Sequence, residues 1–405
     1  MQKSGDAAIL MSKNEIQYLV GSEQLNVKPF PVYSDMAILL LDSLSRELRN
    51  DKEAREYPDI LTFAFWCRKA NIVKLKEQYQ TRYYRIGKGL LFHIAPSNVP
   101  INFAFSLVFG ILAGNGNIVR VSEKDFPQTK IVCWVLKKLL ADPKYELIRQ
   151  QTQVVSYGHV KEINDYYSQL CNMRIIWGGD ATIKEIRKSP IGTRTMEITF
   201  ADRFSFALFN EQSVEQLSEN ELKQIGEKFY NDTYLMDQNA CSSPHLIIWK
   251  ASVEKKGRAR FWNAVYEAAH KYDLPEKKAL DKYTILCEKA TEIDEILSVQ
   301  RYSNILYVVK LKSIPKQMDE LRGKFGLFYE ANLDNEKELC NKITSKVQTC
   351  VTYGINNEKL AEFFMENNVI GIDRIVPIGE AMNISVYWDG YDVIGTMSKK
   401  ISIIK

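Results

Sequence analysis

Between residues 89 and 179 the sequence alternates short apolar runs with segments of helical periodicity, and this alternation restricts the fold more than any other feature. The apolar runs end at Gly, Pro or Ser, as buried strands often do, and read "GLLFHIAP", "GNIVRVS", "TQVVSYG" and "MRIIWGG". The helical segments between them are "PINFAFSLVFGILAG", "PQTKIVCWVLKKLLAD" and "VKEINDYYSQL". Repeated strand–helix–strand units predict a doubly wound α/β domain, a class that commonly binds nucleotides at its strand ends.

The rest of the chain predicts a second domain of the same class. Apolar residues at helical spacing over 34–78 predict a helical N-terminal region. From 205 onward strands and helices alternate again, with helices over "KGRARFWNAVYEAAHKY" and "LDKYTILCEKATEIDEILS" and a strand over "NILYVVKL". We therefore predict an α/β fold of two Rossmann-like domains, bounded at 1–204 and 205–370, with an irregular C-terminal segment over 371–405 that returns to the functional site and to the first domain.

Composition places the chain among soluble globular proteins. It has 405 residues, 45% of them hydrophobic and 26% charged, and a net charge of only +4, which does not indicate a nucleic-acid partner. The N-terminal stretch lacks the apolar core of a secretory signal, so we expect a cytoplasmic protein. The apolar segment 100–114 is shorter than the roughly 20 residues that span a bilayer, and it predicts a buried helix instead.

The cysteines do not form a recognisable framework. There are seven, scattered and without a CxxC pair, which argues against structural disulfides and a zinc site. Neither H-E-x-x-H nor the P-loop pattern is present, so we predict no metal site.

One cysteine has a different neighbourhood. Cys241 lies in "DQNACSSPH", a polar loop that precedes the buried strand "LIIW", and a reactive thiolate needs such surroundings. His245 follows four residues later and has two interpretations. It is either a base paired with the thiol or, as we favour, a structural residue carried away from the thiol by the strand.

Four blocks in order resemble the LuxC-type acyl-CoA reductases, a branch of the aldehyde dehydrogenase superfamily. They are "HIAPSNVPINFAFSLVFGILAGNGNIVRVSEKDFP", "IIWGGD", "DQNACSSPH" and "RIVPIGEAMNISVYWDGYDVIGTMS". The resemblance implies that Cys241 attacks a carbonyl carbon. It also implies that Asn98, in the "APSNVP" loop, stabilises the resulting oxyanion together with the backbone N–H of Cys241.

The resemblance also implies a nicotinamide cofactor. The segment "NIVRVSEK" is similar to the superfamily's Lys-Pro-Ser-Glu contact with the adenosine ribose, but carries Arg120 and Val121 where Lys and Pro are usual. The resemblance assigns cofactor contacts to Arg120, Ser122 and Glu123. It also places Gly178 and Gly179 in a turn that approaches the dinucleotide. LuxC-type enzymes imply NADPH, whose 2′-phosphate Arg120 and Lys124 would neutralise, whereas Glu123 favours NADH, so both cofactors stay open.

The expected general base is missing. Hydrolytic aldehyde dehydrogenases carry a glutamate where this chain places Thr199, with Glu197 two residues earlier, and an alignment shifted by two residues would restore it. A missing base fits an enzyme that must not hydrolyse its thioester. Glu380 and Asp389 are further candidates for the site, although solvated loop carboxylates are the simpler interpretation.

The resulting hypothesis is an NADPH-dependent reduction of a fatty acyl-CoA, or of an acyl group on a partner protein, to an aldehyde through an acyl-Cys241 thioester. The alternative is a Cys-dependent acyltransferase or thioesterase that binds no dinucleotide and uses His245. The resemblance further implies a homo-oligomer and association with an acyl-protein synthetase and a thioesterase.

Overall fold

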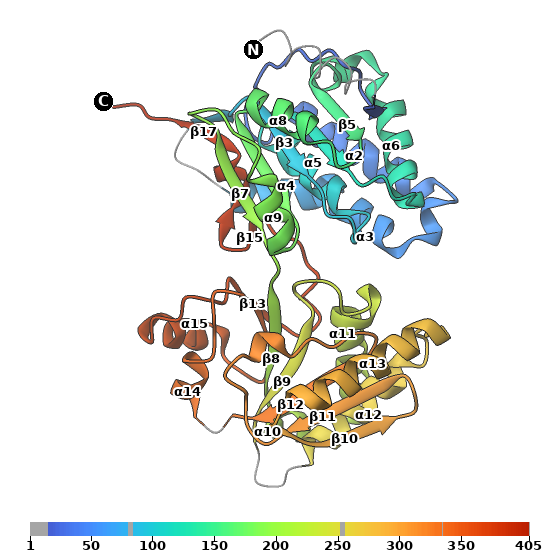
Figure 1. Ribbon diagram of the computed structural model, residues 1–405, viewed down its shortest axis with the longest axis vertical. Helices are drawn as coiled ribbons and strands as arrows, with labels where there is room; N and C mark the ends of the chain where they lie inside the picture. The colour runs from blue at the N-terminus through green and yellow to red at the C-terminus, as the bar shows by residue number, and fades with distance from the viewer. Residues whose placement is uncertain (1–14, 80–83, 252–255, 334, 405) are drawn as a thin grey trace. The chain divides into compact units, whose positions relative to one another are not determined.

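The structure is a computed structural model, and it describes residues 15–79, 84–251, 256–333 and 335–404 of the protein. It divides into two compact units: unit 1 comprises the described residues up to Ala201 together with those from Ile384 onward, and unit 2 comprises Asp202–Asn383 (Figure 1). Residues 371–383, which we expected to leave the second domain, thus stay in unit 2. They do so because strand β14 (Arg374–Pro377) pairs with strand β13 (Val347–Tyr353) of its sheet.

Unit 1 is built on a sheet with the strand order β1-β5-β4-β3-β6-β7. Its strands are β1 (Gln17–Val20), β3 (Leu90–Ile94), β4 (Gly116–Val121), β5 (Thr152–Ser156), β6 (Met173–Trp177) and β7 (Met196–Phe200). The pairs from β5 to β7 are parallel, which confirms the predicted doubly wound topology. The edge strand β1 runs antiparallel to β5 and was not predicted, because its four residues are too few to show a periodicity.

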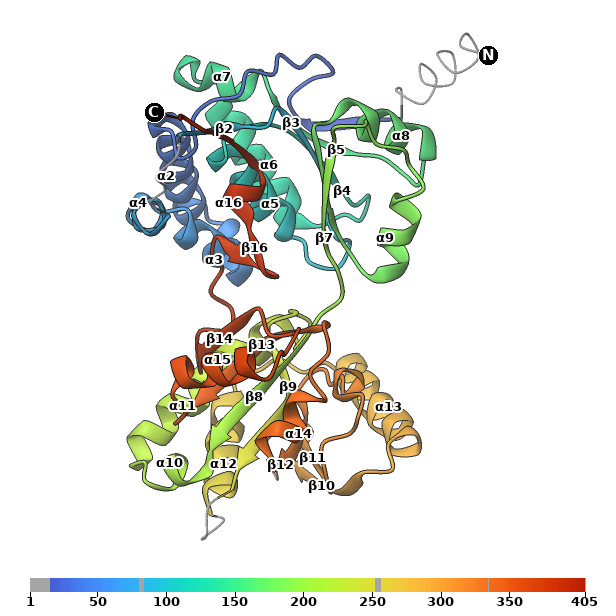
Figure 2. The same cartoon turned by 90° about the vertical axis from the view of Figure 1, so that its left-hand side faces the viewer.

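Successive side chains on these strands pack on opposite faces of the sheet. Leu91, Val119 and Val154 pack with one group of helices, and their neighbours Phe92 and Val155 pack on the other face. Figure 2 shows the first group and the second on opposite sides of the sheet. The first group is α2 (Asp35–Asn50), α3 (Pro58–Trp66), α4 (Lys69–Gln78), α5 (Asn102–Leu112), α6 (Pro127–Leu140) and α7 (Glu146–Arg149), and the second is α8 (Lys161–Leu170) and α9 (Asp180–Ile186).

The predicted helices of unit 1 follow from local sequence signals. Pro58 and Pro127 occupy the first turns of α3 and α6, where a missing N–H costs nothing, and the Ser34 hydroxyl caps α2 by accepting from Ala37 N. In α5 every side chain from Phe103 to Leu112 is buried, as expected for a core helix. No helix among the described residues combines the length and apolarity needed to cross a bilayer.

The C-terminal part of unit 1 consists of short elements, as predicted. They are β15 (Tyr387–Trp388), β16 (Tyr391–Asp392), α16 (Val393–Thr396) and β17 (Ser398–Ile401), and β17 pairs with β2 (Tyr84–Gly87). The β15–β16 turn uses Asp389 and Gly390, whose φ values are 48° and 74°, and this residue pair suits a tight hairpin turn. Asp389 therefore has a structural role in the hairpin.

Unit 2 has a sheet of order β10-β11-β12-β9-β8-β13-β14, parallel except at β10. Its strands besides β13 and β14 are β8 (Phe204–Asn210), β9 (Pro244–Lys250), β10 (Ile296–Tyr302), β11 (Leu306–Leu311) and β12 (Leu327–Asn332). Its helices are α10 (Glu211–Glu215), α11 (Glu219–Thr233), α12 (Gly257–Ala269), α13 (Glu276–Glu292), α14 (Glu336–Cys340) and α15 (Asn357–Glu366). Helices α11 and α12 pack on one face, and α13, α14 and α15 pack on the other.

One predicted helix of unit 2 extends too far. We expected helix through Ser298, but α13 ends at Glu292, Ile293 is extended, and β10 begins at Ile296. The segment that follows contains Ile296, Val299 and Tyr302, residue types that favour a strand. It pairs with β11 as an antiparallel hairpin in which Tyr302 lies opposite Leu306.

Candidate active site

Cys241 lies on the loop between α11 and β9, three residues before β9 begins. The loop, residues 237–243, is called the Cys241 loop below. Asp237 and Gln238 both have left-handed backbone, with φ of 55° and 57°, an uncommon conformation for residues other than glycine. Cys241 itself is half-buried. The thiol is thus held at the amino end of a buried parallel strand.

Several of the other cysteines are poor nucleophiles because they are buried. Burial raises the pKa of Cys133 to about 12 and that of Cys171 to about 11, and it also raises the pKa of Cys67 and Cys350. Only the thiolate is nucleophilic, so these thiols are inert at neutral pH. The exposed Cys287 lies within the regular helix α13. Cys241 therefore has the surroundings best suited to reaction.

Two side chains fix the start of the Cys241 loop. Gln238 is buried, and its amide accepts from Gly326 N at 2.7 Å and donates to Leu327 O at 3.1 Å. Asp237 accepts hydrogen bonds from the Tyr272 hydroxyl and, at 2.9 Å, from Lys278 Nζ. These anchors have no local signal in the sequence, since Lys278 lies 41 residues away from Asp237 along the chain.

The backbone on both sides of the thiol is also tied down. The Ser205 hydroxyl donates to Cys241 O at 2.6 Å and accepts from Thr349 N at 3.2 Å. The Ser243 hydroxyl donates to Asp232 O at 2.7 Å. A pre-organised backbone is what an oxyanion-stabilising N–H requires, because it pays no reorganisation cost during the reaction.

His245 lies on β9 and is buried. Its Nδ1 accepts from Gly323 N at 3.3 Å and its ring stacks on Phe204. Burial, followed by the Arg322 charge, lowers its pKa to about 3. A histidine with these partners and so low a pKa is a weak base, which supports the structural interpretation.

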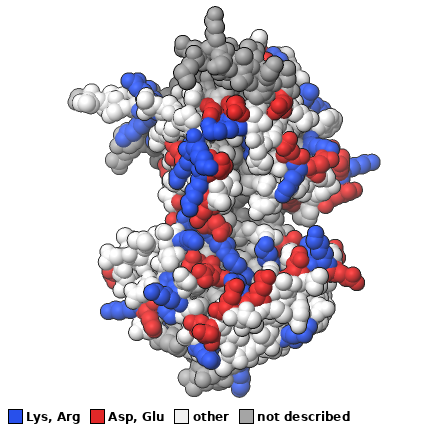
Figure 3. All heavy atoms as spheres, in the orientation of Figure 1, with Lys and Arg blue, Asp and Glu red and all other residues white. Residues whose placement is uncertain are grey.

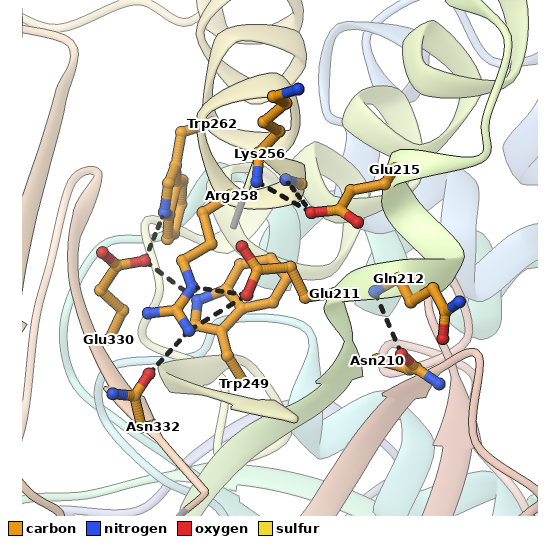
Figure 4. Close-up of polar contacts among 11 residues, drawn as sticks. Asn210, Glu211, Gln212, Glu215, Trp249, Lys256, Arg258, Trp262, Glu330 and Asn332 are labelled. Carbon is orange, nitrogen blue, oxygen red and sulfur yellow. Dashed lines mark hydrogen bonds and ion pairs between the residues drawn. The ribbon is translucent and has the colours of Figure 1, made fainter. Parts of the chain in front are cut away.

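The opposite end of the unit 2 sheet is filled by side chains that bind one another (Figure 4). Arg258 bridges the fully buried Glu211 at 3.2 Å and Asn332 at 2.7 Å. The Glu330 carboxylate accepts from the indole N–H groups of Trp249 and Trp262, at 3.0 and 2.9 Å. The carboxyl ends of parallel strands are the usual ligand position in doubly wound sheets, but here these side chains bind one another. In unit 2 the chemistry of interest therefore lies at the amino end, with Cys241.

In unit 1 the predicted residues gather at the carboxyl ends of the strands. The order β5-β4-β3-β6 reverses direction between β3 and β6, and such a switch point opens a crevice for a ligand. Asn98 is exposed on the loop after β3, and the neighbouring Ser97 O accepts from Lys124 Nζ at 3.2 Å. Asn98 belongs to unit 1 and Cys241 to unit 2.

The predicted ribose-binding residues lie at the carboxyl end of β4, which is adjacent to β3: Arg120 is the next-to-last residue of the strand, and Ser122 and Glu123 follow it. Arg120 donates to Tyr157 O at 3.2 Å and lies over the Tyr157 ring, while its buried Nε has no hydrogen-bond partner among the described residues. The Ser122 hydroxyl accepts from Lys124 N at 3.1 Å. Glu123 is exposed, with its carboxylate beside Gly158.

Gly178 and Gly179 follow β6, on the other side of the switch point. A Cβ on Gly178 would lie 3.2 Å from the Thr182 side chain, so this position favours glycine. A Cβ on Gly179 would meet nothing within 4 Å, so the backbone at the start of α9 is open to approach. The structure thus places the five predicted cofactor residues and Asn98 at one edge of one sheet.

The position of the missing general base is on β7. Thr199 and Glu197 lie two residues apart on this strand and therefore share a face. Glu197 binds the buried Arg174, from Nε at 2.7 Å, and Arg187, also at 2.7 Å. Held between two guanidinium groups, Glu197 is a structural carboxylate. Glu380 is exposed and accepts from the Asn383 amide of its own turn.

Glu197→Gln is expected to lower the free energy of unfolding by about 1–3 kcal/mol, because it leaves the buried Arg174 with weaker partners. Urea unfolding measures this loss. The matched control is Glu185→Gln, which removes an exposed pair with Lys188 and should cost less than about 0.5 kcal/mol. If Glu197→Gln retained full stability but changed the rate of thioester hydrolysis, Glu197 would be the base after all.

Side chains of positive and negative charge occur together on the surface (Figure 3). On the face drawn in Figure 3, Lys and Arg side chains are interspersed with Asp and Glu, in keeping with the small net charge of +4.

Comparison with solved structures identifies the fold. The chain is similar to an NAD-dependent benzaldehyde dehydrogenase from Corynebacterium glutamicum, with a TM-score of 0.60 and 12% identity over 91% of this chain and 85% of that one. Aldehyde dehydrogenase 21 from Physcomitrella patens is similar with a TM-score of 0.64 and 11% identity, over 90% of this chain and 85% of that one. Proline utilization A from Bradyrhizobium japonicum is similar with a TM-score of 0.62 and 11% identity, over 90% of this chain and 42% of that one. The fold is therefore aldehyde dehydrogenase-like, as predicted.

Comparison with curated proteins found no match to the sequence. The family model of the LuxC acyl-CoA reductases, in contrast, matches residues 68–290, which include the Asn98 loop, the strand ends of unit 1 and the Cys241 loop. Because this match spans more than half of the 405 residues, the chain belongs to the LuxC acyl-CoA reductase family.

Proposed function

We propose that the protein reduces a long-chain fatty acyl-CoA, or the acyl group of a partner protein, to the aldehyde through a thioester on Cys241, with NADPH as the preferred donor. The observation that carries the proposal is the position of Cys241, half-buried on an anchored polar loop, in a chain of an acyl-CoA reductase family. An acyl-protein synthetase or a thioesterase is the kind of partner that would handle the same acyl group.

In the proposed reaction the Cys241 thiolate attacks the thioester carbonyl carbon, and the Cys241 N–H and the Asn98 amide stabilise the oxyanion. The carbon–sulfur bond to CoA breaks and the CoA thiolate leaves, so the acyl group is bound to Cys241. After reduction the bond to Cys241 breaks, releasing aldehyde and restoring the thiolate. The ion-paired state of Glu197 supports a site that leaves the thioester intact toward water.

A nicotinamide cofactor supplies the two electrons for this reduction when it is bound. The residues at the carboxyl edge of the unit 1 sheet fit such a group. The open backbone at Gly179 admits a dinucleotide, and the buried Arg120 Nε is a donor without a partner among the described residues. Ser122 and Glu123 would face the ribose from the end of β4.

The experiment is to supply acyl-CoAs of graded chain length with NADPH or NADH and to measure aldehyde, free CoA and cofactor oxidation together. The proposal requires equal amounts of all three, and the chain-length dependence identifies the substrate. Free CoA and fatty acid without cofactor oxidation would instead establish the thioesterase alternative. The buried, weakly basic His245 argues against that alternative.

Arg120→Ala tests the choice of nicotinamide. Only NADPH carries the 2′-phosphate, so losing one charge-assisted contact should raise KM for NADPH by about 10- to 100-fold and leave KM for NADH within a few-fold. Lys130→Ala is the control, since Lys130 pairs with Asp125 on the surface of the same unit. Equal losses for both cofactors, or a wild-type preference for NADH, would show that Glu123 binds the ribose instead.

A further inference from the structure

Asp232 is a fully buried carboxylate that the proposed reaction does not use. It lies in the last turn of α11, next to the start of the Cys241 loop. Its Oδ2 accepts from Gly379 N at 2.6 Å, and its Oδ1 accepts from Ala381 N at 3.0 Å. Both oxygens are thus bound by backbone N–H groups that lie almost 150 residues further along the chain.

The same residue binds the Cys241 loop. Asp232 O accepts from the Ser243 hydroxyl at 2.7 Å, two residues after the thiol. We call residues 378–383 the strap. Strap and loop also meet directly, because the Ser242 hydroxyl donates to Met382 Sδ at 3.8 Å. Asp232 therefore joins the strap and the loop at a single buried point.

The strap is shaped to make these bonds. Gly379 has a φ of 92°, a left-handed conformation that favours glycine, and the Lys228 side chain lies against it. Arg374 holds the far side of the strap by donating to Ala381 O at 3.1 Å and to Asn383 O at 2.8 Å. These contacts aim the N–H groups of Gly379 and Ala381 at one carboxylate.

The charges around Asp232 oppose one another. Burial raises its pKa to about 6, the two backbone N–H groups lower it, the Glu380 charge raises it and the Arg374 charge lowers it. At neutral pH the carboxylate is therefore ionised and accepts two charge-assisted hydrogen bonds, which are stronger than neutral ones.

We infer that Asp232 is a positioning residue for Cys241, whose carboxyl group holds the strap against the Cys241 loop and thereby fixes the thiol for attack. The inference rests on the proposed role of Cys241 as nucleophile. A displacement of the reacting atom by about 1 Å costs up to about 10²-fold in rate, so an anchor of this kind affects the reaction without touching the substrate.

The variant Asp232→Asn distinguishes a role of Asp232 in positioning the Cys241 thiol from a role in folding. Asn keeps the shape and one acceptor, but its amide NH₂ cannot accept from the second backbone N–H. We expect the single-turnover rate of Cys241 acylation to fall about 10- to 100-fold, with a smaller change in KM for acyl-CoA. Stability near pH 7.5 should not fall in parallel, because the raised pKa means that the ionised carboxylate is itself disfavoured in the folded protein.

Hydrogen exchange, measured by mass spectrometry on peptides covering 378–383, tests the strap without any substrate. The carboxylate has a pKa of about 6 in the closed strap and near the ordinary value of 3.8 once exposed. The closed state therefore holds the proton more tightly, acid favours closure, and this gain is lost as the pH rises through 6. The opening constant, corrected for intrinsic exchange, should rise roughly tenfold between pH 5 and pH 8 in the wild type.

In Asp232→Asn this pH dependence should vanish, and in Glu380→Gln its midpoint should move to lower pH because a neighbouring negative charge is gone. Asp281→Asn, an exposed carboxylate on α13, is the control and should behave as the wild type.

Different results would contradict the proposed function and the role of Asp232. If wild-type Cys241 takes up no acyl group, the proposed function is wrong whatever Asp232 does. If the wild type is acylated but Asp232→Asn acylates at the same rate, or exchanges with the wild-type pH dependence, the inference is overturned.

Discussion

Replacing Cys241 with Ala is expected to abolish both the acyl adduct and the reductase activity. Incubating the wild type with acyl-CoA and no cofactor should leave one acyl group per chain, which intact-protein mass spectrometry detects and peptide mapping places on residue 241. The reason is that several competing thiols are buried and protonated, whereas Cys241 is half-buried on an anchored polar loop.

Cys287→Ala is the matched control for this prediction. Cys287 is exposed on α13, and its removal should leave adduct and turnover unchanged. An adduct on Cys287 or Cys340, or full turnover by Cys241→Ala, would end the proposed mechanism. In the Cys287→Ala variant, alkylation with iodoacetamide before acyl-CoA is added should prevent acylation of Cys241, which gives an independent test of the reactive site.

Asn98→Ala is expected to slow acylation of Cys241 by roughly 10²- to 10³-fold, the usual effect of losing one oxyanion donor. Asn98 is exposed on a loop, so the urea midpoint should change little. Single-turnover acylation without cofactor isolates the step.

Asn98→Asp sharpens the test, because it keeps the size of the side chain and replaces the amide donor with a carboxylate. It should be at least as slow as Asn98→Ala. A wild-type acylation rate in both variants would mean that Asn98 is only a turn residue before α5. Loss of stability in both would instead indicate a folding role for the loop.

Local pattern was enough to predict the layers of the fold. The strands β3, β4, β5 and β6 appear where apolar runs were bounded by turn residues, and α5 is buried throughout because its segment is apolar on every side. The resemblance, carried by four blocks of residues, pointed to the family that the comparison then showed. Periodicity and blocks are properties of neighbouring residues, so the sequence contains them directly.

Contacts between distant residues were decided only by the tertiary structure. The sequence marked Cys241 but not its anchors, because Ser205, Lys278 and Asp232 carry no local signal and reach the loop only through the path of the chain. Glu197 remained a candidate base until the structure showed it bound to Arg174 and Arg187.

The same reason explains one of the two errors at element ends, because residues 371–383 stay in unit 2 through the pairing of β14 with β13. The other error has a local origin, since the segment after Glu292 forms β10 as a hairpin with the adjacent strand β11. By itself the sequence determined the strands β3 to β6, the helices α5, α6 and α8 that follow or precede them, and which thiol lies in a polar loop. The tertiary structure decided that β14 pairs with β13 and that the Glu197 carboxylate is bound by arginines. These hydrogen bonds and ion pairs join residues that lie apart in the sequence, and only the folded chain brings them together.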